Sequence, residues 1–150
     1  MQIPEDATPQ DLVAACRRLY ASIDRLDTKA AITVGVSRND LRCLNMLAEA
    51  PVKPSEIAVE LGLTTGSVTT LLDRLEKAKL AQRTRDPDDR RGIIVYPTPY
   101  LFETLGPLYA AVAKEIERIA AEYSAQERQA AVKHLNEASS AYEVATTERD

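Results

Sequence analysis

The chain has few of the residues on which most metal and enzyme sites depend. It contains one histidine, His134, and two cysteines in 150 residues. A structural zinc site needs about four cysteine or histidine ligands at defined spacings, so the composition predicts no metal and no cofactor. A glycine-rich phosphate loop and a nucleophile elbow are also missing, and the acidic residues fall on predicted exposed helix faces. We therefore expect a protein that is not an enzyme.

Long apolar runs are also missing from this sequence. No segment approaches the roughly 20 consecutive apolar residues that a membrane-spanning helix requires, and the N-terminus does not resemble a signal peptide. Two cysteines in a chain of this length are typical of reduced thiols rather than a disulfide framework. With 45% hydrophobic residues the chain can bury a core. We expect one globular domain over residues 1–150, located in the cytoplasm and without a membrane partner.

Residues 54–78 have the pattern of two short helices joined by a tight turn. Pro54 suits the first position of a helix, and Gly62 permits the left-handed backbone that ends one. Thr64 is a good N-cap for the second helix. The apolar residues of that second helix recur at helical spacing and are Val68, Leu71, Leu72 and Leu75. This order predicts a helix-turn-helix, whose second helix enters the DNA major groove.

An arginine-rich hairpin is predicted to follow this motif. Residues 80–85 and 92–96 have the composition of short strands, and a polar turn over residues 86–91 separates them. Guanidinium groups suit both phosphate contacts and the narrow minor groove of DNA. Asp86 and Asp89 are predicted to support this wing by holding arginine side chains through charge-assisted hydrogen bonds. The arginines of the hairpin are Arg83, Arg85, Arg90 and Arg91.

Four segments of the sequence resemble the multiple-antibiotic-resistance regulator (MarR) family of winged helix-turn-helix repressors. They are LRCLNMLA from Leu41, SEIAVELGLT from Ser55, VTTLLDRLE from Val68 and RDPDDRR from Arg85. The resemblance implies a mainly α fold with a small β-hairpin wing (α+β). The DNA-binding lobe would span residues 37–98, and dimerisation helices would span residues 9–30 and 99–147. The chain departs from the family at Lys53, where a small hydroxyl cap is usual, and at Thr70, where many relatives have arginine.

The resemblance implies a cytoplasmic transcriptional regulator. It would be a ligand-responsive repressor that binds a palindromic operator in double-stranded DNA as a homodimer. Arg90 is expected to enter the minor groove, while Arg83, Arg85 and Arg91 contact phosphates or brace the wing. Short hydroxyls and arginine suit the edges of the bases, so we predict that major-groove contacts come from Thr65, Ser67, Thr69, Thr70 and Arg74.

The charge of the chain is unevenly distributed. The total is −4, although DNA-binding proteins are expected to be basic. Residues 74–91 hold seven cationic side chains and four carboxylates, a local charge of +3, which leaves −7 for the rest of the chain. DNA responds to the field within about 8–10 Å at physiological salt, so the basic segment is expected to face the duplex.

The terminal segments carry apolar seams at helical spacing, among them Leu12, Cys16 and Leu19 near the start of the chain. A small winged domain cannot cover all of these seams, so pairing between two copies is favoured over packing within one chain. A twofold dimer would present two recognition helices about 34–36 Å apart, which matches a palindromic site.

The resemblance also implies a small aromatic or phenolic inducer. Residues predicted to line its cleft are Cys16, Arg17, Tyr20 and Met46. Two alternatives remain open at this stage. One is a thiol-based redox regulator that acts through Cys16, and the other is a protein-interaction module with a degenerate winged helix.

Overall fold

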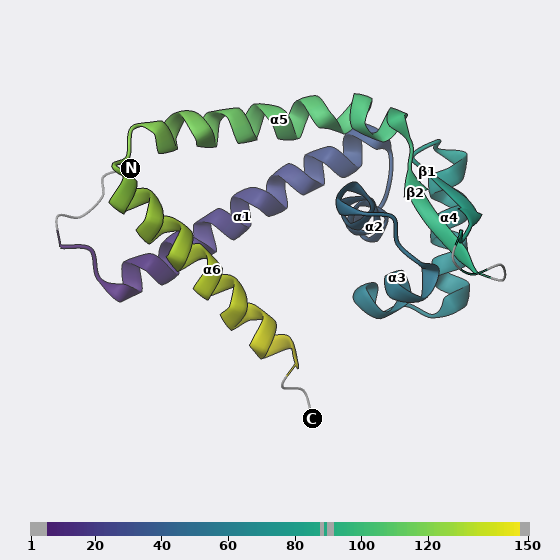
Figure 1. Cartoon of the computed structure of the whole chain (residues 1–150), viewed down its shortest axis with the longest axis horizontal. Coiled ribbons are helices and arrows are strands. Elements are labelled where there is room, and N and C mark those ends of the chain that lie inside the picture. The colour runs from purple at the N-terminus through teal and green to yellow at the C-terminus, as the bar shows by residue number, and fades with distance from the viewer. Residues whose placement is uncertain (1–5, 88, 90–91, 148–150) are drawn as a thin grey trace. The chain divides into compact units, whose positions relative to one another are not determined.

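The helices and the hairpin follow the predicted order in the computed structural model of the chain, which describes residues 6–87, 89 and 92–147. The elements in chain order are α1 (Pro9–Val34), α2 (Arg38–Glu49), α3 (Pro54–Leu61), α4 (Thr65–Lys77), β1 (Ala81–Arg85), β2 (Ile93–Pro97), α5 (Pro99–Ala121) and α6 (Ala125–Thr147) (Figure 1). Over the described residues this confirms a mainly helical fold with a two-stranded wing. In that part of the chain, no helix combines the length and the apolar character needed to span a bilayer.

Contacts along the chain define two compact units. One unit is Ala21–Tyr109, and the other combines Met1–Tyr20 with Ala110–Asp150. Helices α1 and α5 each contribute residues to both units. The predicted DNA-binding lobe over residues 37–98 falls inside the first unit. The use of residues 9–30 and 99–147 for dimerisation stays a prediction.

Side-chain caps explain where α2 and α4 begin. The Ser37 hydroxyl accepts a hydrogen bond from the Asp40 amide at 3.1 Å, and the Asp40 carboxylate accepts one from the Ser37 amide at 3.1 Å. This reciprocal pair is a capping box, which satisfies backbone donors that the first helical turn leaves without partners. The hydroxyl of Thr64 accepts a hydrogen bond from the Ser67 amide at 3.2 Å, which confirms Thr64 as the N-cap of α4.

The turn between α4 and the wing depends on a residue in the left-handed region. Lys79 has φ 60°, a conformation in which glycine is more common. The Lys79 amide donates to the Glu76 carbonyl at 2.9 Å, and the Leu80 amide donates to the Leu75 carbonyl at 2.9 Å. The Thr98 hydroxyl then donates to the Lys79 carbonyl at 2.6 Å. These bonds hold the non-glycine residue in place, so that α4 leads directly into β1.

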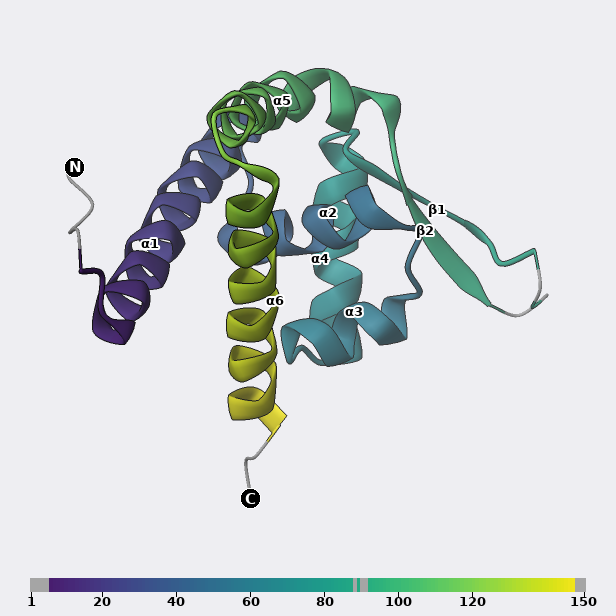
Figure 2. The same ribbon diagram turned by 60° about the vertical axis from the view of Figure 1, so that its left-hand side comes forward.

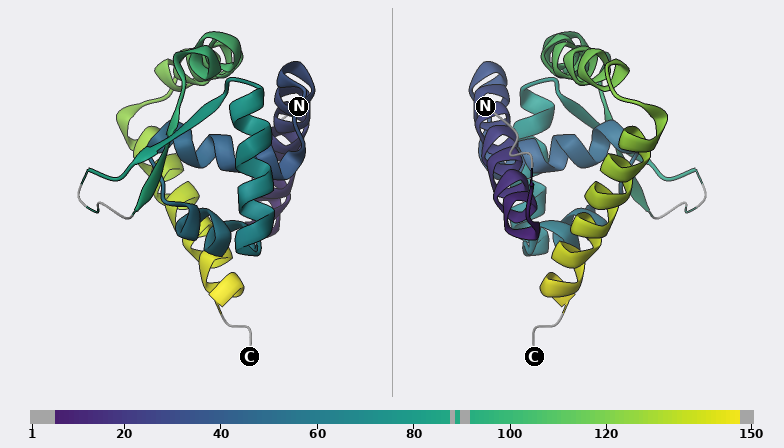
Figure 3. Two further views of the ribbon diagram at one scale, coloured as in Figure 1. Left: turned by 90° about the vertical axis from the view of Figure 1, so that its right-hand side faces the viewer. Right: turned by 90° about the vertical axis from the view of Figure 1, so that its left-hand side faces the viewer.

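The wing is an antiparallel hairpin whose register runs from Ala81 opposite Pro97 to Arg85 opposite Ile93. Each strand begins one residue later than predicted. Val52, between α2 and α3, forms a bridge with Val95 through backbone hydrogen bonds of 3.1 and 2.9 Å. Figure 2 shows the hairpin extending away from α2, α3 and α4, and Figure 3 shows the same extension from two sides.

Buried leucines of α2 and α4 form much of the core of the Ala21–Tyr109 unit. Val68, Leu71, Leu72 and Leu75 on α4 are each at most 1% exposed. They belong to one cluster with buried side chains of the neighbouring elements, which include Leu41, Leu44, Leu47, Ile57 and Val95. Burial of this stripe fixes the rotation of α4 about its axis, and the opposite face is therefore directed to solvent.

We predict that two apolar side chains of α3, Ile57 and Val59, contribute very differently to stability. Ile57 is 0% exposed and Val59 is 84% exposed on the same short helix. Ile57→Ala removes methyl groups from a packed core and should lower the free energy of unfolding by about 2–5 kcal/mol. Val59→Ala is the control and should change it by less than about 0.5 kcal/mol. Urea unfolding followed by circular dichroism measures both, and equal losses would contradict the core described here.

Candidate nucleic-acid interface

The outer face of α4 is polar and accessible. Thr65, Ser67, Thr69 and Thr70 are all exposed, as their predicted role requires. The hydroxyls of Thr64 and Ser67 lie 2.9 Å apart at the start of the helix. The structure therefore brings the four predicted hydroxyl side chains together on one exposed surface. Their contact with DNA stays a prediction.

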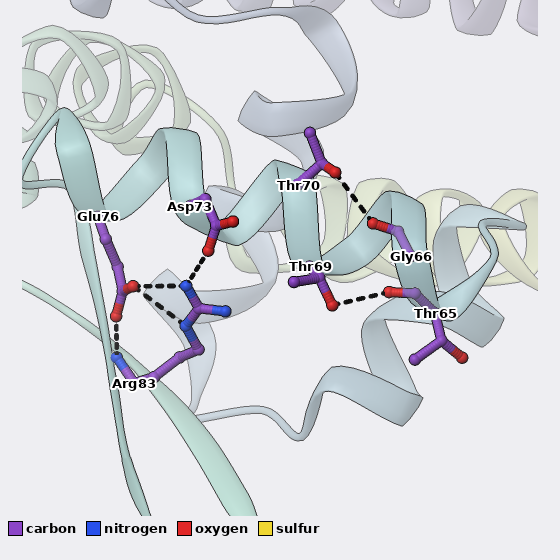
Figure 4. Close-up of polar contacts among 7 residues, drawn as sticks. All are labelled: Thr65, Gly66, Thr69, Thr70, Asp73, Glu76 and Arg83. Carbon is purple, nitrogen blue, oxygen red and sulfur yellow. Dashed lines mark hydrogen bonds and ion pairs between the residues drawn. The ribbon is translucent and has the colours of Figure 1, made fainter.

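Two of these hydroxyls already donate their hydrogen within the helix. Thr69 Oγ1 donates to the Thr65 carbonyl at 3.0 Å, and Thr70 Oγ1 donates to the Gly66 carbonyl at 3.1 Å (Figure 4). A hydroxyl has one hydrogen and two lone pairs. In this geometry Thr69 and Thr70 can offer a ligand only lone pairs and a methyl group. The sequence had predicted that these hydroxyls contact base edges, without separating donors from acceptors.

Arg74 forms an ion pair with the first turn of α2. Its Nη2 lies 2.6 Å from Asp40 Oδ1, and its Nε donates to Asp40 Oδ2 at 3.3 Å. Asp40 is only 2% exposed, whereas the Arg74 side chain is half exposed. The guanidinium therefore fixes α4 against α2 and keeps Nη1 for a further acceptor. The position of Arg74 in the helical pattern predicted a contact with a base. It gave no indication that Arg74 also braces α4 against α2.

The surroundings of Asp40 stabilise its charged form. Burial raises the pKa of this carboxyl, but hydrogen bonds from Arg74 and Ser37 together with the Arg74 charge outweigh burial and hold the pKa below its ordinary value. The charge of Asp40 also adds to burial in raising the pKa of the Cys43 thiol to about 12. Cys43 is fully buried in the core of this unit.

Arg83 joins the wing to the recognition helix. Its Nη2 contacts Asp73 and lies 2.6 Å from Glu76 Oε2, and its backbone amide donates to Glu76 Oε1 at 2.7 Å (Figure 4). The hydrogen bonds from Arg83 lower the pKa of Glu76. The sequence predicted that Arg83 either contacts a phosphate or braces the wing. Its contacts with Asp73 and Glu76 favour the bracing role.

The turn of the wing begins with a buried carboxylate that has an unexpected partner. Asp86 is 5% exposed, and its Oδ2 lies 2.9 Å from Lys53 Nζ. The hydrogen bond to Asp86 raises the pKa of Lys53. Lys53 also begins α3, because its backbone amide donates to Glu56 at 2.7 Å. The residue that departs from the family pattern thus ties α3 to the wing.

The tip of the wing is described only in part. Arg85 is exposed at the end of β1, and Asp89 is exposed as well. Arg90 and Arg91 lie outside the described residues. Their predicted DNA contacts stay predictions, and so does their predicted pairing with Asp86 and Asp89.

Sequence reasoning missed four residues of this interface: Asp40, Lys53, Asp73 and Glu76. The capping box at Ser37 was the only local signal for Asp40. Asp73 and Glu76 had been assigned to a solvated helix face. Their shared partner, Arg83, is 10 and 7 residues away along the chain and lies on β1 beyond the turn, where the helical periodicity of α4 does not apply.

The predicted ligand-binding residues fall into different units. Cys16, Arg17 and Tyr20 belong to the unit that includes Met1–Tyr20, whereas Met46 lies in Ala21–Tyr109. Within its own unit Cys16 is partly exposed, and its Sγ lies 3.5 Å from His134 Nε2. Helical periodicity gave no indication of this contact, because the two residues are 118 positions apart in the chain. Redox control through Cys16 stays a prediction.

Comparison with known proteins identifies relatives of this chain. Residues 34–92 match the MarR family. The chain is 35% identical over 99 residues to YcgE of Bacillus subtilis, which is named an uncharacterised HTH-type transcriptional regulator. That match covers 65% of this chain and 64% of YcgE, so the chain spans less than two thirds of that relative.

Solved structures share the fold over nearly the whole chain. The crystal structure of RV1404 from Mycobacterium tuberculosis has a TM-score of 0.68 at 20% identity and covers 93% of this chain and 98% of its own. The structure of Streptococcus pneumoniae FabT in complex with DNA has a TM-score of 0.67 at 22% identity, covering 91% and 98%. At these identities the likeness establishes the winged-helix fold.

The ion pair of Asp40 predicts a specific dependence of stability on pH. Because the pKa of Asp40 is lowered from 3.8 in the folded chain, its stabilisation is present above that value and is lost as the pH falls through the folded pKa. Asp40→Asn should lower the free energy of unfolding by about 1–3 kcal/mol at neutral pH, and the difference from the original chain should shrink below about pH 4. Urea unfolding across this pH range measures both effects.

The exposed Glu60, replaced by Gln, serves as the control for this experiment and should show neither effect. A loss on Asp40→Asn that stays constant from neutral to acidic pH would contradict the assigned ion pair.

Proposed function

We propose that this chain is a transcriptional regulator of the MarR family that binds double-stranded DNA through α4 and the wing. The observation that carries the proposal is the exposed hydroxyl face of α4, which is directed outward by the buried stripe and held relative to the wing by Arg83. The DNA complex of FabT, a protein of the same fold, supports DNA as the partner.

The hydroxyls of α4 are proposed to contact base edges in the major groove. Thr69 and Thr70 present acceptors and methyl groups, so their best partners are the amino groups of adenine or cytosine and the methyl group of thymine. Phosphate oxygens are acceptors and are therefore poor partners for these two side chains. Thr65 and Ser67, in the first helical turn, are the remaining hydroxyl contacts.

The arginines are proposed to divide into two groups. Arg74 and Arg83 act mainly by positioning α4 and the wing, because each is held by carboxylates of the same unit. Arg85, Arg90 and Arg91 are assigned to the DNA, with Arg90 in the minor groove and the other two on phosphates. Carboxylates hold two of the seven cationic side chains of residues 74–91, which leaves fewer for phosphate neutralisation, so binding to random sequence should be weak.

The terminal segments are proposed to form a homodimer. Apolar side chains of the unit that contains α6 are exposed in the single chain, among them Val112, Ile116, Ile119, Leu135 and Tyr142. Exposed apolar surface of this kind is usually covered by a partner, and a second copy is the simplest one. A twofold axis would give the operator the symmetry of a palindrome.

The regulator is further proposed to be a cytoplasmic repressor whose operator affinity falls when an inducer binds. A ligand can act only if it prefers one separation of the two recognition helices. Loss of DNA binding with retention of the fold is the competing interpretation, in which the chain is a protein-interaction module.

Selection of bound fragments from a random DNA pool, followed by titration of a selected duplex and a shuffled duplex, tests the proposal. The selected duplex should bind at least about a thousandfold more tightly, with affinity falling steeply between about 50 and 200 mM salt. Thr70→Ala should weaken the selected complex by about 1–3 kcal/mol and leave the shuffled complex nearly unchanged. Equal affinity for both duplexes would favour the interaction module.

Thr33→Ala is a matched control for the Thr70 variant. Thr33 is also exposed, and its hydroxyl donates to the Lys29 carbonyl at 2.8 Å, as that of Thr70 does four residues back along α4. Thr33→Ala therefore removes the same kind of hydroxyl-to-carbonyl hydrogen bond, but on α1 instead of α4. If Thr33→Ala weakened the operator complex as much as Thr70→Ala, the base contact would be rejected.

We also predict that a charge on the apolar seam disrupts the dimer. Ile116→Glu places a carboxylate within the proposed interface and should shift the mass measured by light scattering from two chains to one. Ala121→Glu introduces the same charge on the opposite face of α5 and should leave the dimer intact. A single-chain mass for the unchanged protein at micromolar concentration would refute the proposed dimer.

A further inference from the structure

The Ala21–Tyr109 unit contains an apolar cavity formed by residues of α1, α2 and α5. Its volume is about 510 Å³, within the range of small-molecule sites. Leu44, Leu101, Phe102 and Leu105 supply much of its apolar wall. All of its lining residues belong to one compact unit, and none of them is Cys16, Arg17, Tyr20 or Met46. The cavity therefore differs from the predicted ligand cleft.

The charged groups of the cavity wall have a single sign. Asp27 on α1 and Glu49 on α2 line it, and no lysine, arginine or histidine occurs among the described residues that do so. Tyr109 on α5 points its hydroxyl at Asp27 and donates to Oδ1 at 3.3 Å. Burial, the Asp27 charge and this hydrogen bond raise the pKa of Tyr109 to about 12, so the phenol stays neutral at physiological pH.

We propose that this cavity binds a small lipophilic organic cation, which acts as the inducer. The proposal rests on the regulatory function proposed above and names the chemical class of its ligand. A cationic group beside Asp27 gains Coulomb attraction in a partly desolvated site, and the rings of Phe102 and Tyr109 provide aromatic surface suited to cations. An aromatic acid would instead bring a third carboxylate towards Asp27 and Glu49.

The same contacts connect the cavity to the helices on which operator binding depends. Asp27 and Tyr109 join α1 to α5, and both helices continue into the second unit. The cavity also borders α2, whose first turn holds Arg74 of the recognition helix through Asp40. A cation that takes over the Asp27 carboxylate competes with the Tyr109 hydroxyl for it. Such a ligand favours a different packing of α1 and α5 and thereby alters the operator complex.

Titration calorimetry on the full-length protein without DNA tests the binding step. Phenyltrimethylammonium is the probe, tert-butylbenzene is its neutral isostere, and salicylate represents the aromatic acids. The cation should bind at least about tenfold more tightly than the isostere, and salicylate should bind more weakly than either. Equal affinity for the cation and the isostere, or stronger binding of salicylate, would overturn the proposal.

Variants assign the charge effect to Asp27. Asp27→Asn should lower the affinity for phenyltrimethylammonium by about tenfold. The affinity for tert-butylbenzene should stay within about twofold of that of the original chain. Glu103→Gln removes one negative charge from exposed surface of α5 outside the cavity lining and should change neither affinity. Circular dichroism establishes that each variant is folded. If Asp27→Asn binds the cation like the original chain, or both variants weaken it equally, the assignment to Asp27 is wrong.

A mobility-shift titration with the selected duplex separates this inference from the proposed function. Phenyltrimethylammonium should lower the affinity of the original chain for the selected duplex. The Asp27→Asn variant should need an about tenfold higher concentration of the cation for the same decrease. Binding of the cation without any effect on the operator would reject its role as inducer while leaving DNA binding intact. If no duplex is selected at all, the regulatory function and the inducer role fail together, and calorimetry alone decides the ligand class.

Discussion

Burial of one apolar stripe on α4 is the constraint on which the rest of this structure depends. Val68, Leu71, Leu72 and Leu75 are removed from water together, and a helix that buries four side chains on one face has only one rotational setting. The threonines of the opposite face are directed to solvent as a consequence. The stability of the core and the chemistry offered to DNA therefore share one cause, because a change of the stripe would rotate the hydroxyl face as well as open a cavity.

Charged side chains in this unit have a different role from the one that a basic sequence segment first indicates. Asp40 and Asp86 are buried carboxylates, and each has a cationic partner that remains partly exposed. Buried charges require such partners because an unpaired carboxylate is costly to desolvate. Arg74, Arg83 and Lys53 therefore fix α2, α3, α4 and the wing relative to one another. Fewer cations are left to contact the duplex, so a larger share of the proposed binding energy would come from hydroxyl and methyl groups at the base edges.

The sign of the charge also separates the two proposed binding surfaces. The segment from Arg74 to the wing is positive, whereas the cavity wall bordered by Asp27 and Glu49 is negative. An anionic polymer and a small cation would thus be attracted to different parts of the same unit. This separation would allow a protein with a net charge of −4 to bind DNA and, in the proposed cavity, to select small ligands by charge.

The sequence by itself determined the elements and their order, because these follow from local rules. Thr64 as a helix cap, Gly62 as a turn and the spacing of Val68 and Leu71 each act within a few residues. Only the tertiary structure decided the partners of Arg74, Arg83 and Lys53, which are 34, 7 and 33 residues away. It also decided the composition of the cavity, which joins residues of three helices. Periodicity assigns a residue to a face of a helix, but the facing side chain depends on how the helices pack.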